Sequence, residues 1–518
     1  MLRRSAFIDL ALALALGLLA AALRPPDWEL AKALAPRPDA LEFAVSALNL
    51  ASGDGFNLRI GDQRHPPRYE VGYPLLLAGW YRATGMRIEN AAVLNPLLSI
   101  LGIVLFFAAC RQCFGRTAAV LAPLLLVLSR LQIETARPVM SESFSFLLGC
   151  GLLCAAAQRR LPVWRWLIAG LLAAALGAIR PIQWPGIVAG AAVPLVLEAR
   201  RRASWAYVAG AGLLLAPLLL DRWARLGAIW VSGYAYWLRD QPQSFSLDYL
   251  LSTPQGPGTL SFYTSRFIQW DSAWPFAAVA LAAIGCWSAA RARSAGATGW
   301  WIGAAVLALP CAGFSLYFFL AERYLVTALP FLGWSCAAGI DAWIRRAGVR
   351  RWTAAALGAA AIVQAGWFAL RLPPPSETSI SGELDGLRAA ARRVQAGDVL
   401  IVDTCLALAA WEVPRAELVL LRPWVDEHYT RLAVRRIDAG ARIRDVLGLA
   451  PTLFVRGHAP FRPAFRRLEH AWRSDRTVLL LLSGRRDELR RLMRLRIWEL
   501  RGLEREPLWV LAEATPNE

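Results

Sequence analysis

The chain has 518 residues, 57% of them hydrophobic, and a mean hydropathy of +0.40. Ordinary globular domains are roughly 45–50% apolar, so this composition excludes a simple soluble protein. The formal net charge of +19 would suit a nucleic-acid partner, but the positions of the charges along the chain argue against that class.

Apolar stretches of about 17–22 residues recur along the first part of the chain, and each matches the length that crosses a hydrocarbon core. If the N-terminus is cytoplasmic, the short inside loops hold about sixteen arginines against about two acids, Glu198 and Asp341, a strong positive-inside bias. The excess charge therefore sets the topology and contacts anionic headgroups. Eleven spans are predicted, near residues 5–23, 91–110, 117–133, 141–157, 164–180, 183–198, 205–221, 273–290, 299–320, 325–343 and 352–370.

The outside loop at 25–90 is too long to be only a connector. The span before it has a signal-peptide-like basic start, but its long core lacks a convincing cleavage site, so we expect a retained anchor. Asp39 and Glu42 stand at i and i+3 in what reads as a short interfacial helix, so both carboxylates point to one side. His65 and Arg68 follow in a loop rich in turn residues. Simpler explanations exist, since acids favour a first helical turn and a histidine in a Pro-Pro loop suits a solvated or packed ring.

Further ionisable residues stand at the outside ends of later spans. Glu142 begins the fourth span, Arg180 joins the fifth to the sixth, and Arg323 joins the ninth to the tenth. Taken singly, Glu142 suits a helix cap, and arginines near span ends often snorkel to headgroups. Their common side nevertheless predicts one outward-facing cavity lined by acids and arginines, with His65, Tyr73 and Tyr324 as further cavity candidates.

The rest of the chain predicts a second outside segment and a small C-terminal domain. The segment covers 222–272, and a Pro-rich hinge then opens an α/β domain at 371–518. Helices are predicted at 387–394 and 487–500. This domain has no Gly-rich phosphate loop after a strand, so we assign it to packing or acceptor contact rather than catalysis. Its strands are predicted at 398–402, 417–421, 452–455, 477–482 and 508–511.

Metal chemistry has little support in the sequence. The Cys110-x-x-Cys113 pair has no companion pair that would complete a site. We therefore predict no metal site and no essential cofactor, although the acid pair Asp39 and Glu42 leaves room for a divalent metal.

At these residues the chain resembles the GT-C superfamily of integral-membrane glycosyltransferases. Within it the likeness is to bacterial relatives of polyprenyl-phosphate-mannose protein mannosyltransferases and to lipid A aminoarabinose transferases. The order and topological placement of several short motifs carry the resemblance, over roughly the first 330 residues. The motifs are Asp39-Ala-Leu-Glu42-Phe, Leu48-Asn-Leu-Ala-Ser-Gly53-Asp-Gly55-Phe, His65-Pro-Pro, Gly72-Tyr-Pro-Leu-Leu-Leu, Met140-Ser-Glu142, Arg180-Pro181 and Glu322-Arg-Tyr-Leu.

The resemblance implies a mainly α polytopic membrane fold and a catalytic role for the first-loop acid, which corresponds to Asp39. Many members carry two adjacent acids there, or an acid and a tyrosine three residues later. Here Glu42 and Phe43 depart from both patterns. Asp39, Glu42 and Glu142 are thus the catalytic candidates.

The implied reaction is an inverting transfer of a sugar from a polyprenyl-phosphate donor to the hydroxyl of a protein, lipid or glycan acceptor. It would take place at the outer face of a bacterial cytoplasmic membrane, with the N-terminus inside and the C-terminal domain outside. Arg68, Arg180 and Arg323 are the candidates for binding the donor phosphate, because guanidinium matches phosphate in a bidentate fork.

Two other classes remain open at this point. A transporter or lipid flippase usually places charges near the middle of the bilayer on broken helices, often within internal repeats. This sequence has its charges at span ends and shows no duplicated half. A non-catalytic scaffold that presents the C-terminal domain would leave the first-loop acids without a purpose.

Overall fold

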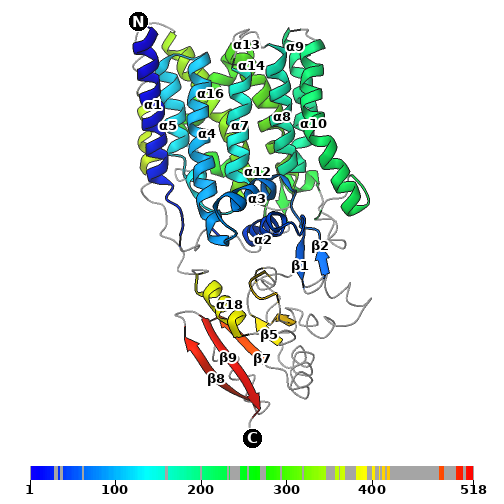
Figure 1. Cartoon of the computed structure of the whole chain (residues 1–518). Helices are drawn as coiled ribbons and strands as arrows, with labels where there is room; N and C mark the ends of the chain where they lie inside the picture. Colours follow the sequence, from blue (N-terminus) through cyan, green and yellow to red (C-terminus); the bar gives the residue numbers. More distant parts are fainter. Residues whose placement is uncertain are drawn as a thin grey trace.

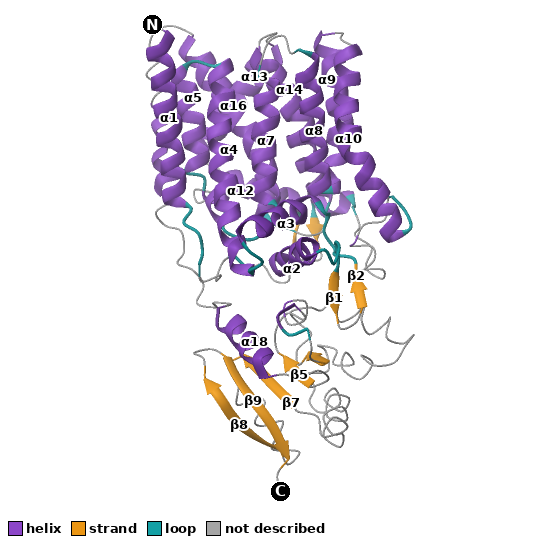
Figure 2. Cartoon of the chain, in the orientation of Figure 1, coloured by secondary structure: helices purple, strands orange, loops and turns teal. Residues whose placement is uncertain are grey.

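The computed structural model shows a bundle of apolar helices with shorter elements across one end (Figures 1 and 2). It describes residues 2–28, 33–34, 39–60, 63–157, 162–198, 201–229, 233, 245–253, 256–268, 276–291, 295–317, 320–345, 356, 358–360, 362–367, 381–393, 399–402, 408, 411–414, 417–420, 478–483, 498–505 and 509–516.

The bundle consists of long helices whose side chains interlock in one large apolar core. Five continuous helical runs in the described residues are long and apolar enough to cross a membrane, and five shorter apolar helices accompany them. The predicted count of eleven spans therefore stays a prediction. The helices are α1 (Leu2–Leu23), α4 (Ala91–Cys113), α5 (Arg116–Val127), α6 (Arg130–Thr135), α7 (Glu142–Ala156), α8 (Val163–Ile179), α9 (Trp184–Glu198), α10 (Arg201–Leu226), α13 (Phe276–Arg291), α14 (Ala295–Gly303), α15 (Leu309–Gly313) and α16 (Leu329–Arg345).

Short helical segments connect several of these helices. They are η1 (Ile88–Asn90), η2 (Pro181–Gln183), the π-helical η4 (Ala304–Ala308), η5 (Phe314–Leu316) and η6 (Glu322–Ala328).

The span predicted at 117–133 is wrong as a single helix, because α5 ends at Val127 and α6 starts at Arg130. The buried Arg24 explains the break. Its guanidinium donates to the Val127 carbonyl at 2.8 Å and also bonds to Gln132, so it satisfies the end of α5. The span predicted at 352–370 is helical at the positions that the structure describes there.

The first loop folds across the end of the bundle as two helices, shown beside β1 and β2 in Figure 1. The turn after the first helix needs Gly53 and Gly55, whose φ angles are +93° and +90°. The second helix starts hard against α8, because a Cβ at Gly72 would lie 2.7 Å from the Ala178 carbonyl oxygen. The elements are α2 (Asp39–Ser52), β1 (Leu58–Ile60), β2 (Gln63–His65) and α3 (Gly72–Thr84).

The second long segment is shorter than predicted at its start. Helix α10 continues to Leu226, so the first residues of the segment predicted at 222–272 still belong to the bundle. The segment also forms η3 (Leu247–Leu250), β3 (Ser252–Thr253), β4 (Gly256–Pro257) and α12 (Thr259–Ile268).

The C-terminal part contains a helix and a mixed five-stranded sheet of order β6-β5-β7-β9-β8. Strand β5 is parallel to β6 and β7, whereas β9 is antiparallel to β7 and β8. The strand predicted at 452–455 lies outside the described residues. The elements are α18 (Ser381–Arg393), β5 (Val399–Val402), β6 (Glu417–Leu420), β7 (Val478–Ser483), β8 (Trp498–Arg505) and β9 (Trp509–Pro516).

The helix predicted at 487–500 is wrong over its last three residues, which begin β8, and the rest of it lies outside the described residues. The cross-strand pairing of Leu500 with Ala514 shows the reason, because a neighbouring strand decides the conformation there. Helix α18 contacts the first loop. Leu387 belongs to the same apolar cluster as residues of α2 and α3, and Arg388 pairs with Glu89 at 2.6 Å.

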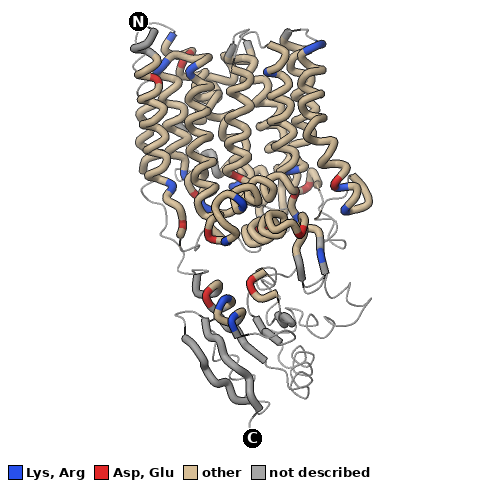
Figure 3. Tube along the Cα trace, in the orientation of Figure 1, with Lys and Arg blue, Asp and Glu red and all other residues tan. Residues whose placement is uncertain are grey.

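In the described part of the chain, charged residues gather at the two ends of the bundle and its middle carries few of them (Figure 3). At the end where α1 begins, Asp9 pairs with Arg111 at 3.0 Å and with Arg116 at 2.9 Å. The opposite end carries α2, α3 and the cluster of acids and arginines described below.

Candidate active site

The first turn of α2 holds two acids that meet one arginine. Arg68 Nε donates to Glu42 Oε2 at 2.7 Å, and the Arg68 backbone N–H donates to the other oxygen of Glu42. The same guanidinium reaches Asp39 Oδ1 at 3.2 Å. Glu42 and Arg68 are both buried, whereas 16% of the Asp39 side chain is exposed. Their spacing of three positions on α2 lets both acids face Arg68.

The cluster continues from Asp39 through two further arginines. Arg323 of η6 donates to Asp39 Oδ2 at 2.8 Å, and its Nε lies 4.0 Å from Glu142 Oε1. Glu142, at the start of α7, also accepts a hydrogen bond from Arg180 at the end of α8. We call the resulting alternating chain the site network. Its members in order are Glu42, Arg68, Asp39, Arg323, Glu142 and Arg180.

Two atoms of the site network lack partners in the described part of the chain. Glu142 Oε2 and Arg180 Nη1 are buried, and neither has a hydrogen-bond partner among the described residues. Buried polar atoms of this kind are uncommon in native proteins, and at a cavity they are available to water, an ion or a ligand. Arg180 thus has one N–H donor without a partner among the described residues. Its guanidinium lies over the ring of Tyr324, with the guanidinium carbon 5.7 Å from the ring centroid.

The charges of the site network keep Asp39 ionised. Burial raises the pKa of this carboxyl, but the positive charges of Arg68 and Arg323 outweigh that effect, helped by hydrogen bonds from Tyr69 and Arg323. The net pKa lies below the usual 3.8. Asp39 is therefore a carboxylate at physiological pH and accepts hydrogen bonds only.

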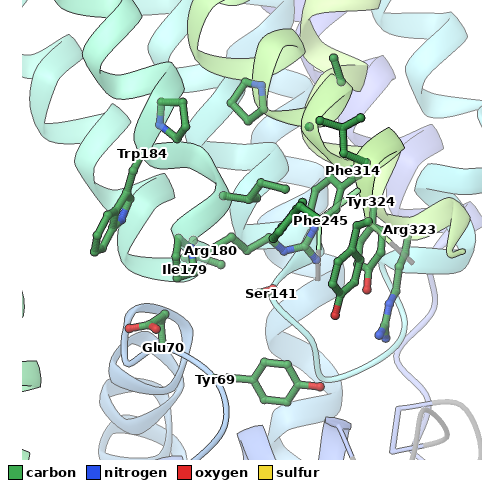
Figure 4. Close-up of a pocket in the computed structure, with 18 of the residues that line it drawn as sticks. Tyr69, Glu70, Ser141, Ile179, Arg180, Trp184, Phe245, Phe314, Arg323 and Tyr324 are labelled. Carbon is green, nitrogen blue, oxygen red and sulfur yellow. The ribbon is translucent and has the colours of Figure 1, made fainter. Parts of the chain in front are cut away.

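A cavity of about 940 Å³ opens beside the site network (Figure 4). Its walls are mostly apolar and include Phe245 and Phe314. The charged residues in its described lining are four arginines and two glutamates, a formal excess of two positive charges. These residues are Arg68, Glu70, Glu142, Arg180, Arg222 and Arg323.

Asp39 and Glu42 lie one contact behind this lining, bonded to Arg68 and Arg323. In Figure 4, Tyr324 and Arg323 stand at one side of the cavity, Trp184 and Glu70 at the other, and Arg180 between them.

The remaining predicted candidates have different positions. Tyr324 lines the cavity and stacks on Phe314, with ring centroids 4.2 Å apart. Tyr73 is fully buried, and its hydroxyl donates to Asn95 at 2.8 Å, so it fixes α3 against α4. His65 ends β2, where its backbone pairs with Leu58, and its side chain lies outside the described residues.

Sequence reasoning missed two charged residues of the cavity wall, Glu70 and Arg222. They form a largely buried ion pair, and Arg222 lies over the Trp184 ring with its guanidinium carbon 4.9 Å from the centroid. The signal was available: Arg222 follows directly after the span predicted at 205–221, at a span end like Arg180. Within the described residues, no three His, Cys, Asp or Glu side chains form a group that could hold a metal ion.

The Glu42 interaction with Arg68 makes a stability prediction. Replacing Glu42 with Ala leaves the buried guanidinium of Arg68 without its main partner. We therefore expect the free energy of unfolding to fall by about 3–5 kcal/mol. Thermal unfolding of the detergent-purified protein measures this change. The control is Glu134→Ala, whose pair with Arg130 is partly exposed and contributes about 0.3–0.5 kcal/mol. Equal effects of the two variants would contradict the assigned role.

Comparison with protein-family models and with curated proteins gives no match. Among solved structures, ArnT from Cupriavidus metallidurans bound to undecaprenyl phosphate is similar, with a TM-score of 0.62 and 13% identity over 98% of this chain and 97% of that one. The apo form of the same protein gives a TM-score of 0.61 at 14% identity, covering 98% of both chains.

An oligosaccharyltransferase from Archaeoglobus fulgidus, tethered with an acceptor peptide, is similar at a TM-score of 0.52 and 11% identity. This match covers 92% of the present chain and 69% of the archaeal one. At such low identity the likeness is one of fold. The chain is a multi-pass membrane protein with the fold of the GT-C glycosyltransferases, the superfamily to which both neighbours belong.

Proposed function

We propose that this protein is a glycosyltransferase that moves a sugar from a polyprenyl-phosphate donor to an acceptor hydroxyl, with inversion at the anomeric carbon. The single observation that carries the proposal is the position of the site network beside an apolar cavity at one end of the bundle. The fold shared with a protein that binds undecaprenyl phosphate supports the donor class.

The cavity suits a lipid-linked anion in size and polarity. Ligand pockets commonly enclose about 300–1,000 Å³, with mostly apolar walls and a few converging polar groups. The apolar wall would take the first prenyl units, and the excess of arginine in the lining would take the phosphate. Arg180 is the best-placed donor, because its buried Nη1 has no hydrogen-bond partner within the described residues.

Asp39 would act as the general base. The acceptor oxygen attacks the anomeric carbon, the bond from that carbon to the phosphate oxygen breaks, and the acceptor proton passes to Asp39. Both Asp39 oxygens already accept a hydrogen bond, from Arg68 and from Arg323, but a carboxylate has about four lone-pair sites. The exposed part of the Asp39 side chain leaves access for the acceptor.

The leaving group is a polyprenyl phosphate monoester, whose developing charge Arg68, Arg180 and Arg323 would stabilise. Glu142 would hold Arg180 and Arg323 in position, and Glu42 would do the same for Arg68. This assignment requires no metal ion. That no metal is essential stays a prediction.

The proposal places the site at the outer face of a bacterial cytoplasmic membrane. The end of the bundle with Arg111 and Arg116 would face the cytoplasm under the positive-inside rule, which puts α2 and the C-terminal sheet outside. A protein, lipid or glycan acceptor would approach from that side. A transporter or flippase is less consistent with the structure, because in the described part of the chain charged residues gather at the ends of the bundle and few lie in its middle (Figure 3).

Labelled lipid tests the proposal against the flippase alternative. Proteoliposomes that contain the purified protein receive undecaprenyl phosphate carrying a radiolabelled sugar, with an envelope extract as the source of acceptors. We expect release of undecaprenyl phosphate together with transfer of the label to a product that is not a prenyl lipid. Movement of the intact labelled lipid between leaflets, with no release of undecaprenyl phosphate, would instead show a flippase.

A further inference from the structure

The ion pair between Glu70 and Arg222 lines the same cavity as the site network but is not part of it. Arg222 is only 5% exposed, and its Nη1 donates to the Ile229 carbonyl at 3.2 Å. Its guanidinium also rests on the ring of Trp184. Buried ion pairs are weak contributors to stability, since desolvation offsets much of their attraction. A fixed pair at a cavity wall is better explained by binding.

The chemistry of this pair differs from that of the phosphate-binding arginines. Glu70 and Arg222 neutralise each other, so together they offer a carboxylate as acceptor and a guanidinium as donor without net charge. Such a pair suits neighbouring hydroxyl groups, because the carboxylate accepts from one hydroxyl while the guanidinium donates to the oxygen of the next. The sugar of the proposed donor carries such neighbouring hydroxyl groups.

The placement of the pair along the chain, close to the arginines of the phosphate site, also suits a sugar. Glu70 follows Arg68 by two residues, and two residues of extended chain span about 7 Å at most. Trp184 follows Arg180 by four residues around the corner of η2. Each of two chain segments therefore supplies one arginine to the phosphate site and one residue to the pair or its support. A sugar bonded directly to the phosphate would reach the pair.

We propose that Glu70 and Arg222, held by Trp184, bind the hydroxyl groups of the donor sugar and set the sugar specificity of the enzyme. This inference rests on the proposed function, and it assigns the pair to the donor rather than to the acceptor. The close packing of the start of α3 against the end of α8 at Gly72 holds the segment with Glu70 next to the segment with Trp184.

Binding measurements with matched lipids test the inference on the full-length protein in nanodiscs. The probes are undecaprenyl-phosphate-linked glucose, galactose, mannose and arabinose, with undecaprenyl methyl phosphate as a diester that lacks a sugar. We expect the wild type to bind at least one sugar lipid about ten to a hundred times more tightly than the methyl diester, the effect of hydrogen bonds to charged groups.

The test variant is Glu70→Gln/Arg222→Met. It removes both charges of the ion pair, so neither charge is left buried without its partner. We expect it to lose the preference for the sugar lipid while its affinity for the methyl diester stays within about twofold of wild type. The control is Asp221→Asn/Arg225→Met, which alters a partly exposed ion pair on the same helix and should keep the preference.

Three results would overturn the inference: a wild type without preference for any sugar, a test variant that keeps the preference, or one that binds both lipids equally weakly. If the wild type binds the methyl diester but prefers no sugar, the phosphate site stands and only the inference fails. If the wild type binds neither kind of lipid, the proposed function fails with it.

Discussion

Replacing Asp39 with Asn should lower the rate of sugar transfer by about 10²–10⁴-fold, the usual contribution of a general base. The amide keeps the size of the side chain and can still accept a hydrogen bond from Arg323, but it cannot take the acceptor proton. A single-turnover assay with saturating labelled donor measures the chemical step. Donor affinity should change much less, because Asp39 lies behind the arginines that line the cavity.

The control for this variant is Asp54→Asn, an exposed acid in the same loop, which should keep its activity. The pH dependence of the transfer rate and of the free energy of unfolding provides a second check. Because the pKa of Asp39 is lowered, the carboxylate and the stability it contributes are fully present above the usual 3.8 and are lost only as pH falls through the lower folded value. A loss of activity in Asp39→Asn no greater than in Asp54→Asn would rule out the base.

Replacing Arg180 with Met should lower the rate by about 10²–10³-fold, the loss expected when one preorganised donor to a developing oxyanion is removed. Arg180 is the arginine of the site network with a buried donor that has no partner in the described part of the chain. Its pairing with Glu142 fixes where that donor lies. The same single-turnover assay measures the change, and product inhibition by undecaprenyl phosphate should weaken in parallel.

Arg180→Lys distinguishes charge from geometry. A lysine restores the positive charge without the planar fork, so it should recover only part of the rate. The matched control is Arg82→Met, since Arg82 is exposed, donates to the Ala51 carbonyl and is not among the described residues that line the cavity. Wild-type rates in both Arg180 variants would mean that the phosphate binds elsewhere.

The sequence was informative about the site because charge in an apolar chain is expensive and its positions are visible. The spacing of Asp39 and Glu42 predicted two acids on one face of a helix, and α2 begins at Asp39. The pairing of Asp39 with Arg323 was not predictable, because 284 positions separate them and only the packing of the bundle brings them together. The sequence therefore indicated the kinds of residues and their side of the membrane, but not the order of their contacts.

The sequence-based predictions that were wrong had local causes. Hydropathy ended a predicted span at residue 221, although α10 runs one turn further, and Arg222 was lost with that turn. Apolar length alone merged α5 with α6, because the buried guanidinium of Arg24 that ends α5 comes from a distant part of the chain. In the C-terminal part, helix propensity at 487–500 competed with strand pairing, and β8 shows that pairing decided the last three residues.

A structure of the protein in complex with undecaprenyl phosphate tests the central claim most directly. Our account predicts that the phosphate lies in the cavity, with Arg180 Nη1 at hydrogen-bond distance, about 2.7–3.2 Å, and with Arg68 or Arg323 as a second donor. The prenyl chain should run along the apolar wall beside Phe314. A phosphate bound outside this cavity, or remote from all three arginines, would contradict the account.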